Sequence, residues 1–212
     1  MAGMAESRLL IVATGLGWPS SLEARLVSFG LSHGNAAELA AFLADITATT
    51  GSLPLRSGIH AQVWPHGTDN EDPGTRLARI FHEGFATGVD SLCVIGTSAP
   101  HLPAAYILEA FGRLTQHRDS VVLGPTDTGG YYLIGTSRTA PYSLLKDIPW
   151  GTPNVLTETL QRAVINELSI SLLPSLQVVE TPEHGRRLSR DLRRGVVIAP
   201  QTQSILRNTG LE

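Results

Sequence analysis

The sequence predicts a single-domain α/β protein, a three-layer sandwich in which helices cover both faces of a mostly parallel, Rossmann-like sheet. Short apolar runs of strand length alternate along the chain with longer amphipathic segments of helical period. Several of the short runs are apolar at every position, which is typical of strands buried on both faces of a parallel sheet. The 212 residues are enough for one well-packed core. We therefore expect one domain at residues 1–200 and a polar tail at residues 201–212.

Six apolar runs are expected to be strands. The first follows Arg8, and it is too short, and too poor in cleavage-site features, to be the core of a signal peptide. The predicted strands are Leu9–Thr14, Ile59–Trp64, Ser91–Gly96, Ser120–Gly124, Tyr131–Thr136 and Ile170–Leu173.

Five helices are predicted between and after these strands. Asn35 with Glu38 forms a capping-box-like start for the first. A proline marks the beginning of each later one, at Pro73, Pro103, Pro153 and Pro182. In such sheets ligands bind beyond the carboxyl ends of the strands, so the polar segments that follow strands are where a site is expected. These segments are Thr14–Ser21, Thr97–Leu102, Pro125–Gly130 and Val179–Glu183.

The amino-acid composition limits the kinds of molecule that the protein is expected to bind. A net charge of -3 argues against non-specific nucleic-acid binding. Lys146 is the single lysine, so phosphate contacts would come from arginine, main-chain amides or a metal ion. Cys93 is the single cysteine, which excludes an internal disulfide and favours a cytoplasmic location. No apolar stretch approaches the roughly 18 residues of a membrane span, so no membrane partner is expected. A homodimer is left open.

The segment Val121–Gly135 is the most informative part of the chain. Two apolar strands flank a polar turn that contains Asp127 and the pair Gly129-Gly130. Paired glycines allow a positive φ and a close approach of the backbone to another group. A carboxylate beside such a turn suits a ribose or a metal ion, although a simple tight connection between strands would have the same sequence.

Four motifs in order resemble a bacterial glycosyltransferase-like family of the nucleotide-diphospho-sugar transferase (GT-A) superfamily. That superfamily also contains guanylyl- and cytidylyltransferases. Its members tend to read G-T-D-C-P-D-L-P, G-P-x-x-D-G-G-Y-Y-L-I-G, I-P-W-S-T-P-x-V-L and D-V-D-T-P-E-D-L. The matching segments here are Gly96–Pro103, Gly124–Gly135, Ile148–Leu156 and Val178–His184.

The resemblance implies a nucleotide-linked small molecule as ligand, with a divalent metal ion, Mg²⁺ or Mn²⁺, at its phosphates. It assigns catalysis, and binding of ribose or of a weakly held metal ion, to Asp127 and Glu180. It places the acceptor near His101, Thr128 and Trp150. Nucleotide and phosphate contacts fall to Thr14, Gly15, Gly17, Arg25, Arg76, Ser98, Gly129 and Gly130.

The chain departs from the family at the expected metal ligands. Ser98, His101 and Thr128 stand where aspartates are expected, and Glu180 keeps a carboxylate on a longer side chain. The family's basic K-T-R-L becomes Glu23–Leu26, and Gly51–Gly67 is short for the usual strand-helix-strand. A metal ion would therefore bind weakly or not at all, with arginine as the alternative source of positive charge. Five arginines of the last predicted helix are interpreted as a solvated face, with a phosphate or partner site as the less favoured alternative: Arg186, Arg187, Arg190, Arg193 and Arg194.

Three functions are compatible with these residues. The favoured one is an enzyme, a transferase moving a glycosyl or nucleotidyl group from a nucleotide donor. The second is a binding or assembly protein that kept the GT-A fold without catalysis. The third is a serine hydrolase, because Ser98 lies in a near match to the nucleophile elbow and is followed in order by Asp127 and His184. Pro100 and Pro103 argue against the third, since the elbow needs a helix directly after the serine.

Overall fold

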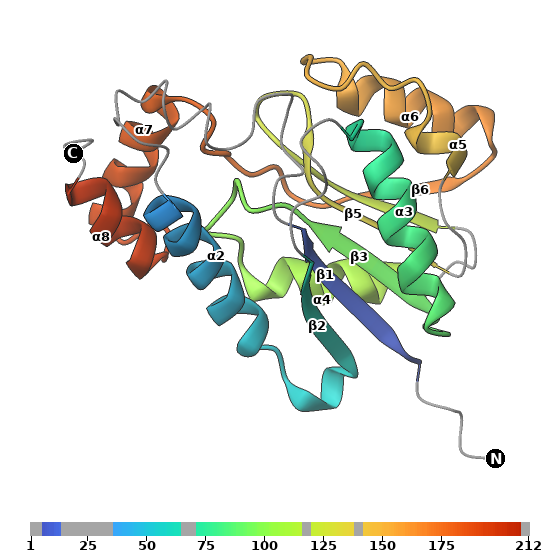
Figure 1. Cartoon of the computed structure of the whole chain (residues 1–212), viewed down its shortest axis with the longest axis horizontal. Helices are drawn as coiled ribbons and strands as arrows, with labels where there is room; N and C mark the ends of the chain where they lie inside the picture. Colours follow the sequence, from blue (N-terminus) through green and yellow to red (C-terminus); the bar gives the residue numbers. More distant parts are fainter. Residues whose placement is uncertain (1–5, 14–35, 65–70, 116–119, 138–141, 209–212) are drawn as a thin grey trace.

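The fold is that of a computed structural model, which describes residues 6–13, 36–64, 71–115, 120–137 and 142–208 (Figure 1). One six-stranded sheet forms its centre, in the order β2-β1-β3-β5-β4-β6. The single-domain α/β prediction is confirmed, and each predicted strand is observed with small differences at its ends. The strands are β1 (Arg8–Ala13), β2 (Ile59–Trp64), β3 (Ser91–Ile95), β4 (Ser120–Pro125), β5 (Tyr131–Ser137) and β6 (Ser169–Leu172).

Strand β5 is the one reversed member of this mostly parallel sheet. It pairs antiparallel with β3 on one side and with β4 on the other, while the remaining neighbours are parallel. The connection from β4 to β5 covers only residues 126–130, which is too short for the crossover that a parallel neighbour needs. The carboxyl ends of β3 and β4 therefore lie at the same edge as the start of β5.

Alternating side chains of the central strands build two separate cores. Leu10, Val12, Cys93 and Ile95 face α2 (Ala36–Gly51) and α4 (Ala104–Leu114). Leu9, Ile11, Leu92 and Val94 face α3 (Pro73–Ala86), α5 (Tyr142–Leu145) and α6 (Val155–Ile165). Both faces of the sheet are thus covered by helices, which explains why these strands are apolar throughout.

Two predicted helix starts are displaced from their prolines. Pro103 is the N-cap of α4, which begins at Ala104. Helix α6 begins at Val155, two residues after Pro153. Gly151 has a φ of 92°, and the Thr152 hydroxyl donates to the carbonyl of Pro149 and accepts from the N–H of Asn154. These turn contacts hold residues 149–154 out of the helix. Between Gly51 and Trp64 the chain forms only the 3-10 turn η1 (Leu55–Ser57) and β2.

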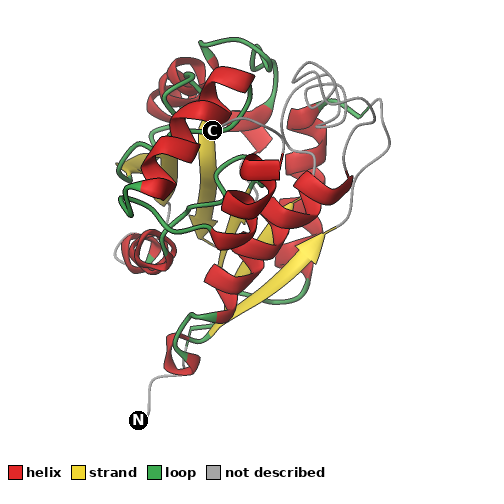
Figure 2. Cartoon of the chain, turned by 90° about the vertical axis from the view of Figure 1, so that its left-hand side faces the viewer, coloured by secondary structure: helices red, strands yellow, loops and turns green. Residues whose placement is uncertain are grey.

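The segment expected to be a polar tail contains a helix, α8 (Pro200–Asn208). Together with α7 (Pro182–Arg193) it lies at one end of the molecule, on the left in Figure 1 and facing the viewer in Figure 2. Leu206 of α8 packs with Phe42 of α2 and Leu188 of α7 in a third, smaller core. The Asp45 carboxylate of α2 accepts from the N–H groups of Gln201 and Thr202. A residue distant in the sequence therefore caps the first turn of α8.

Candidate functional site

Three segments meet at the carboxyl edge of the sheet: the loop after β3, the turn after β4, and the extended chain that leads from β6 to α7. The N–H of Asp127 donates to the carbonyl of Leu176 at 3.1 Å, and the N–H of Val179 donates to the carbonyl of Ser98 at 2.8 Å. The extended chain therefore crosses the edge from β4 toward β3. The sequence predicts a site at this edge, and these three segments form the frame of that candidate site.

The Thr126–Gly130 turn is stabilised by the hydroxyl of Thr126 and by a hydrogen bond from α6. The Thr126 hydroxyl accepts from the N–H of Gly130 at 3.0 Å and lies 3.1 Å from the hydroxyl of Thr128. Gly129 has a φ of 85°, and the N–H of Leu156 donates to its carbonyl at 2.9 Å. A Cβ at Gly129 would collide with the backbone of Pro153. The glycine is thus required by the close approach of the turn to the chain entering α6.

The Asp127 carboxylate is bound on both oxygens. Its Oδ1 accepts from the N–H of Val178 at 3.2 Å, and its Oδ2 accepts from Nη2 of Arg187 at 2.9 Å. Nε of Arg187 donates to Oε1 of Gln177 at 2.6 Å. Asp127 therefore connects the turn after β4 with both the extended chain and α7.

Glu180 lies at the entry to α7, and its N–H donates to Nδ1 of His184 at 3.3 Å. The next residue, Thr181, is the N-cap, because its hydroxyl accepts from the N–H of His184. Glu180 thus lies directly before the N-cap of α7, the helix that carries Arg187. It is partly buried at this position.

His101 is buried behind this frame, with 7% of its surface exposed. Burial lowers the pKa of His101 below its ordinary value, and the carboxylates of Asp191 and Asp127 oppose that shift. Its Nδ1 makes no hydrogen bond within the described part of the chain. The charge of the imidazole is thus influenced by one carboxylate on α7 and by another on the turn after β4.

Arg76 and Trp150 form a second group around the start of α3. Arg76 is 6% exposed in the first turns of that helix, and burial lowers its pKa while Glu71 raises it. A Cβ on Gly74 would lie 2.7 Å from Nε1 of Trp150, so α3 and the indole are in close contact. Trp150 also packs edge-on against Tyr131, with ring centroids 6.1 Å apart. The indole packs as part of the core on this face.

These candidate residues form two groups. One group, Ser98, His101, Asp127 and Glu180, gathers around the extended chain and α7. The other, Arg76 and Trp150, lies on the α3 side of the sheet. Thr14, Gly15, Gly17 and Arg25 lie outside the described residues. Sequence reasoning missed Arg187 and Gln177 as partners of Asp127, because a basic helix face carries no signal for a residue sixty positions earlier.

The contacts of Asp127 and His184 contradict the serine hydrolase interpretation. A catalytic triad needs the aspartate to accept from the histidine. Here Asp127 accepts from Val178 and Arg187, and Nδ1 of His184 accepts from Glu180. Helix α4 begins at Ala104, six residues after Ser98, so no nucleophile elbow is formed.

A divalent ion would need a set of oxygen ligands, usually with several carboxylates. Among the described residues, no three His, Cys, Asp or Glu side chains are grouped so that they could hold a metal ion. At Asp127, moreover, the guanidinium of Arg187 already occupies one carboxylate oxygen. The Asp127 side chain as placed here does not fit a divalent ion, because the ion would have to share the carboxylate with another cation.

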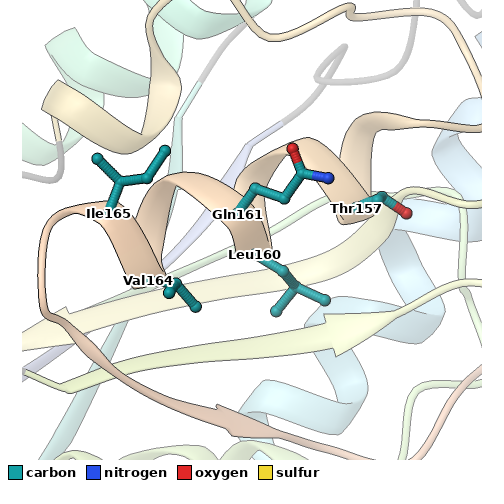
Figure 3. Close-up of a pocket in the computed structure, with 5 residues that line it drawn as sticks. All are labelled: Thr157, Leu160, Gln161, Val164 and Ile165. Carbon is teal, nitrogen blue, oxygen red and sulfur yellow. The ribbon is translucent and has the colours of Figure 1, made fainter.

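A shallow apolar depression lies elsewhere, on the outer side of α6 (Figure 3). It is lined by Thr157, Leu160, Gln161, Val164 and Ile165. None of the candidate site residues lines it, and it offers no charged group to a nucleotide. In the part of the chain that the structure describes, no helix is long and apolar enough to span a membrane.

Known structures share this fold. A proposed nucleotide-diphospho-sugar transferase from Desulfovibrio desulfuricans is similar, with a TM-score of 0.76, 22% identity and coverage of 98% of this chain and 97% of the other. A cytidylyltransferase from Leptospira borgpetersenii serovar Hardjo-bovis has a TM-score of 0.52, 10% identity and coverage of 97% and 96%. CMP:2-keto-3-deoxy-manno-octonic acid synthetase in complex with CTP has a TM-score of 0.51, 10% identity and coverage of 90% and 100%. No curated protein sequence matches this chain.

The fold thus places the chain in the class of α/β proteins with a nucleotide-diphospho-sugar transferase-like sheet. Within that class, residues 39–152, more than half of the chain, match the family described as "Uncharacterized protein conserved in bacteria (DUF2064)". The chain belongs to this family. The fold that the sequence motifs implied is confirmed, whereas membership of a particular glycosyltransferase family is not shown.

Proposed function

We propose that this protein is a transferase that binds a nucleotide-linked donor at the carboxyl edge of its sheet and moves a glycosyl or nucleotidyl group. The observation that carries the proposal is the meeting of the loop after β3, the turn after β4 and the entry to α7 at that edge. Ligands of such sheets bind at this position. The similarity of the fold to a proposed nucleotide-diphospho-sugar transferase, to a cytidylyltransferase and to a synthetase in complex with CTP agrees with this class of donor.

The candidate residues have distinct roles in this proposal. Main-chain N–H groups at Thr14, Gly15 and Gly17, with the Arg25 side chain, would contact the phosphates; these four residues lie outside the described part of the chain, in the segment that comes after β1 in the sequence. Buried Arg76, near the start of α3, would contribute a positive charge. Burial lowers the pKa of this guanidinium, and a bound anion would raise it again.

The turn after β4 and its surroundings would hold the rest of the donor and the acceptor. Ser98 and the Gly129-Gly130 backbone would contact the nucleotide, and Glu180 with Asp127 would orient the ribose and the reacting group. His101, Thr128 and Trp150 would border the acceptor. Trp150 in this role would use the ring face that does not pack on α3.

A thermal-shift panel tests the proposal. UDP, GDP, CDP and ADP and their sugar conjugates, with CTP, are added to the purified protein with and without Mn²⁺. A ligand at one hundred times its dissociation constant should stabilise the folded state by about 2.7 kcal/mol. Ligands that shift the melting temperature are then incubated with the enzyme, and release of nucleoside diphosphate or pyrophosphate is measured. Absence of a shift with every nucleotide would refute the proposal.

A second candidate is a binding protein without catalysis. The observation in its favour is that Asp127, the carboxylate next to the position of the family's expected aspartate, is engaged by Val178 and Arg187. The same panel separates the two, since this candidate predicts a nucleotide-dependent shift with no product release from any donor.

A further inference from the structure

We propose that Arg187, held in place by Asp127 and Gln177, is the cation that receives the diphosphate of the donor, in the role for which a divalent metal ion is expected. This inference rests on the proposed function and names the chemistry of its phosphate site. It follows from three features of the described residues: the partners of Asp127, the fixed orientation of Arg187, and the charge of α7.

The first feature is that the Asp127 carboxylate already binds the guanidinium of Arg187. One of its oxygens accepts from Nη2 of Arg187 at 2.9 Å, and the other accepts from the N–H of Val178 at 3.2 Å. A Mg²⁺ or Mn²⁺ ion bound there would stand beside a fixed positive charge and be repelled by it. The carboxylate is better suited to orienting the arginine than to coordinating an ion.

The second feature is that the guanidinium is fixed and still accessible. Nε donates to Oε1 of Gln177 at 2.6 Å, and the Gln177 amide donates in turn to the carbonyl of His184 at 3.2 Å. The Arg187 side chain nevertheless keeps 48% of its surface exposed. Within the described residues, Nη1 has no hydrogen-bond partner, so its two N–H groups are available as donors. Arginine N–H groups are well suited to bind phosphate oxygens.

The third feature is an excess of positive charge on the helix that carries Arg187. Residues 182–194 contain five arginines against only Glu183 and Asp191. Arg186 and Arg190 pair with Glu183, and Arg187 is the arginine directed to the turn after β4. The surrounding field therefore favours an anion at this edge. Arg193, further along the same helix, is exposed and provides a matched control.

The test measures binding of inorganic pyrophosphate, UDP, GDP, CDP and ADP in EDTA and in Mn²⁺ by titration calorimetry. We expect binding in EDTA, and Arg187→Gln should raise the dissociation constant at least about tenfold, the loss expected for a charge-assisted hydrogen-bonded pair. Arg193→Gln, which removes the same charge from the same helix, should change it by less than about threefold. Arg187→Lys should recover only part of the affinity, because it keeps the charge without the planar fork.

Asp127→Asn separates orientation of the arginine from metal ligation. If Asp127 orients Arg187, this variant weakens binding in EDTA by less than Arg187→Gln does, because the amide oxygen can still accept. Binding that requires Mn²⁺ and is lost in Asp127→Asn would overturn this inference and leave the proposed function standing. Binding of pyrophosphate, but of no nucleotide, with dependence on Arg187 would refute the proposed function and retain the anion site. Wild-type binding of no probe, or equal affinity of Arg187→Gln and wild type, would refute the site itself.

Discussion

Gly129 shows at the scale of one residue how the turn after β4 is tied to the rest of the fold. Its φ of 85° lies in the left-handed region, and any Cβ would meet the backbone of Pro153. We expect Gly129→Ala to lower the free energy of unfolding by about 2 kcal/mol or more, because it combines backbone strain with a clash against main-chain atoms. Urea denaturation followed by circular dichroism measures the loss.

Gly112 offers the matched control for this substitution. It lies within α4, is exposed, and a Cβ there would meet nothing within 4 Å. Gly112→Ala should raise the free energy of unfolding by about 0.5–1 kcal/mol, since alanine has the higher helix propensity. Equal stability of the two variants would show that the turn does not constrain Gly129.

His101 predicts a pH dependence of stability. Burial lowers its pKa in the folded state below the ordinary value of 6.5, even though Asp127 and Asp191 favour the charged form. Below pH 6.5, His101 therefore binds a proton in the unfolded chain but not in the folded protein. The free energy of unfolding consequently falls as the pH decreases from 6.5 toward the pKa of His101 in the folded state. Above pH 6.5 this residue contributes no pH dependence.

The measurement compares wild type with His101→Gln, which cannot titrate. The free energy of unfolding is determined between pH 8 and pH 5. The wild type should lose more stability than the variant over the acidic half of this range. Parallel curves for the two proteins would show that the imidazole is solvated in the folded state.

Helix α8 depends on Asp45, a contact that belongs to the scale of secondary-structure elements. The buried carboxylate, on α2, accepts from two N–H groups at the start of α8, at 3.1 Å and 2.7 Å. Asp45→Ala should lower the free energy of unfolding by about 1–3 kcal/mol, because it leaves two N–H donors without this partner, and the one at Thr202 is buried. Asp45→Asn keeps one acceptor and should lose less.

Thermal denaturation measures this loss, and limited proteolysis locates it. If α8 detaches first, a protease should remove the C-terminal segment from Asp45→Ala before it cleaves the sheet. Asp90→Ala serves as comparison, since Asp90 accepts from the N–H of Ser7 far from α8. The same C-terminal cleavage in both variants would contradict the assigned role of Asp45.

At the scale of the whole molecule, Cys93 reports on global unfolding. It lies on β3 in the middle of the sheet with no exposed surface, and burial raises the pKa of its thiol. Because the thiolate is the reactive form, the folded protein should not react with a thiol reagent. Labelling should begin only with denaturant, at the midpoint found by circular dichroism. Rapid labelling of the folded protein would show that the sheet opens locally.

The predictability of this protein from sequence falls off with the distance between interacting residues. The first strand, predicted at Leu9–Thr14 and observed at Arg8–Ala13, and the helix after Asp72 are predicted correctly to within one residue at each strand end, because apolar period and capping residues act over a few positions. The start of α6 was misplaced by two residues, since Gly151 and Thr152 stabilise a turn that the proline rule does not describe. Helix α8 was missed, because its cap comes from Asp45 on another helix.

The same limit applies to the candidate site. The sequence alone determined the class of fold, the polar segments at the ends of its strands, and the glycine pair in the turn, of which the structure requires Gly129. These features follow from side-chain period and from backbone conformations that few residues adopt. Only the tertiary structure decided that Asp127 binds Arg187 and that His101 is buried and feels the charges of Asp127 and Asp191. Those contacts depend on how α7 packs across the edge of the sheet, and local sequence does not encode that packing.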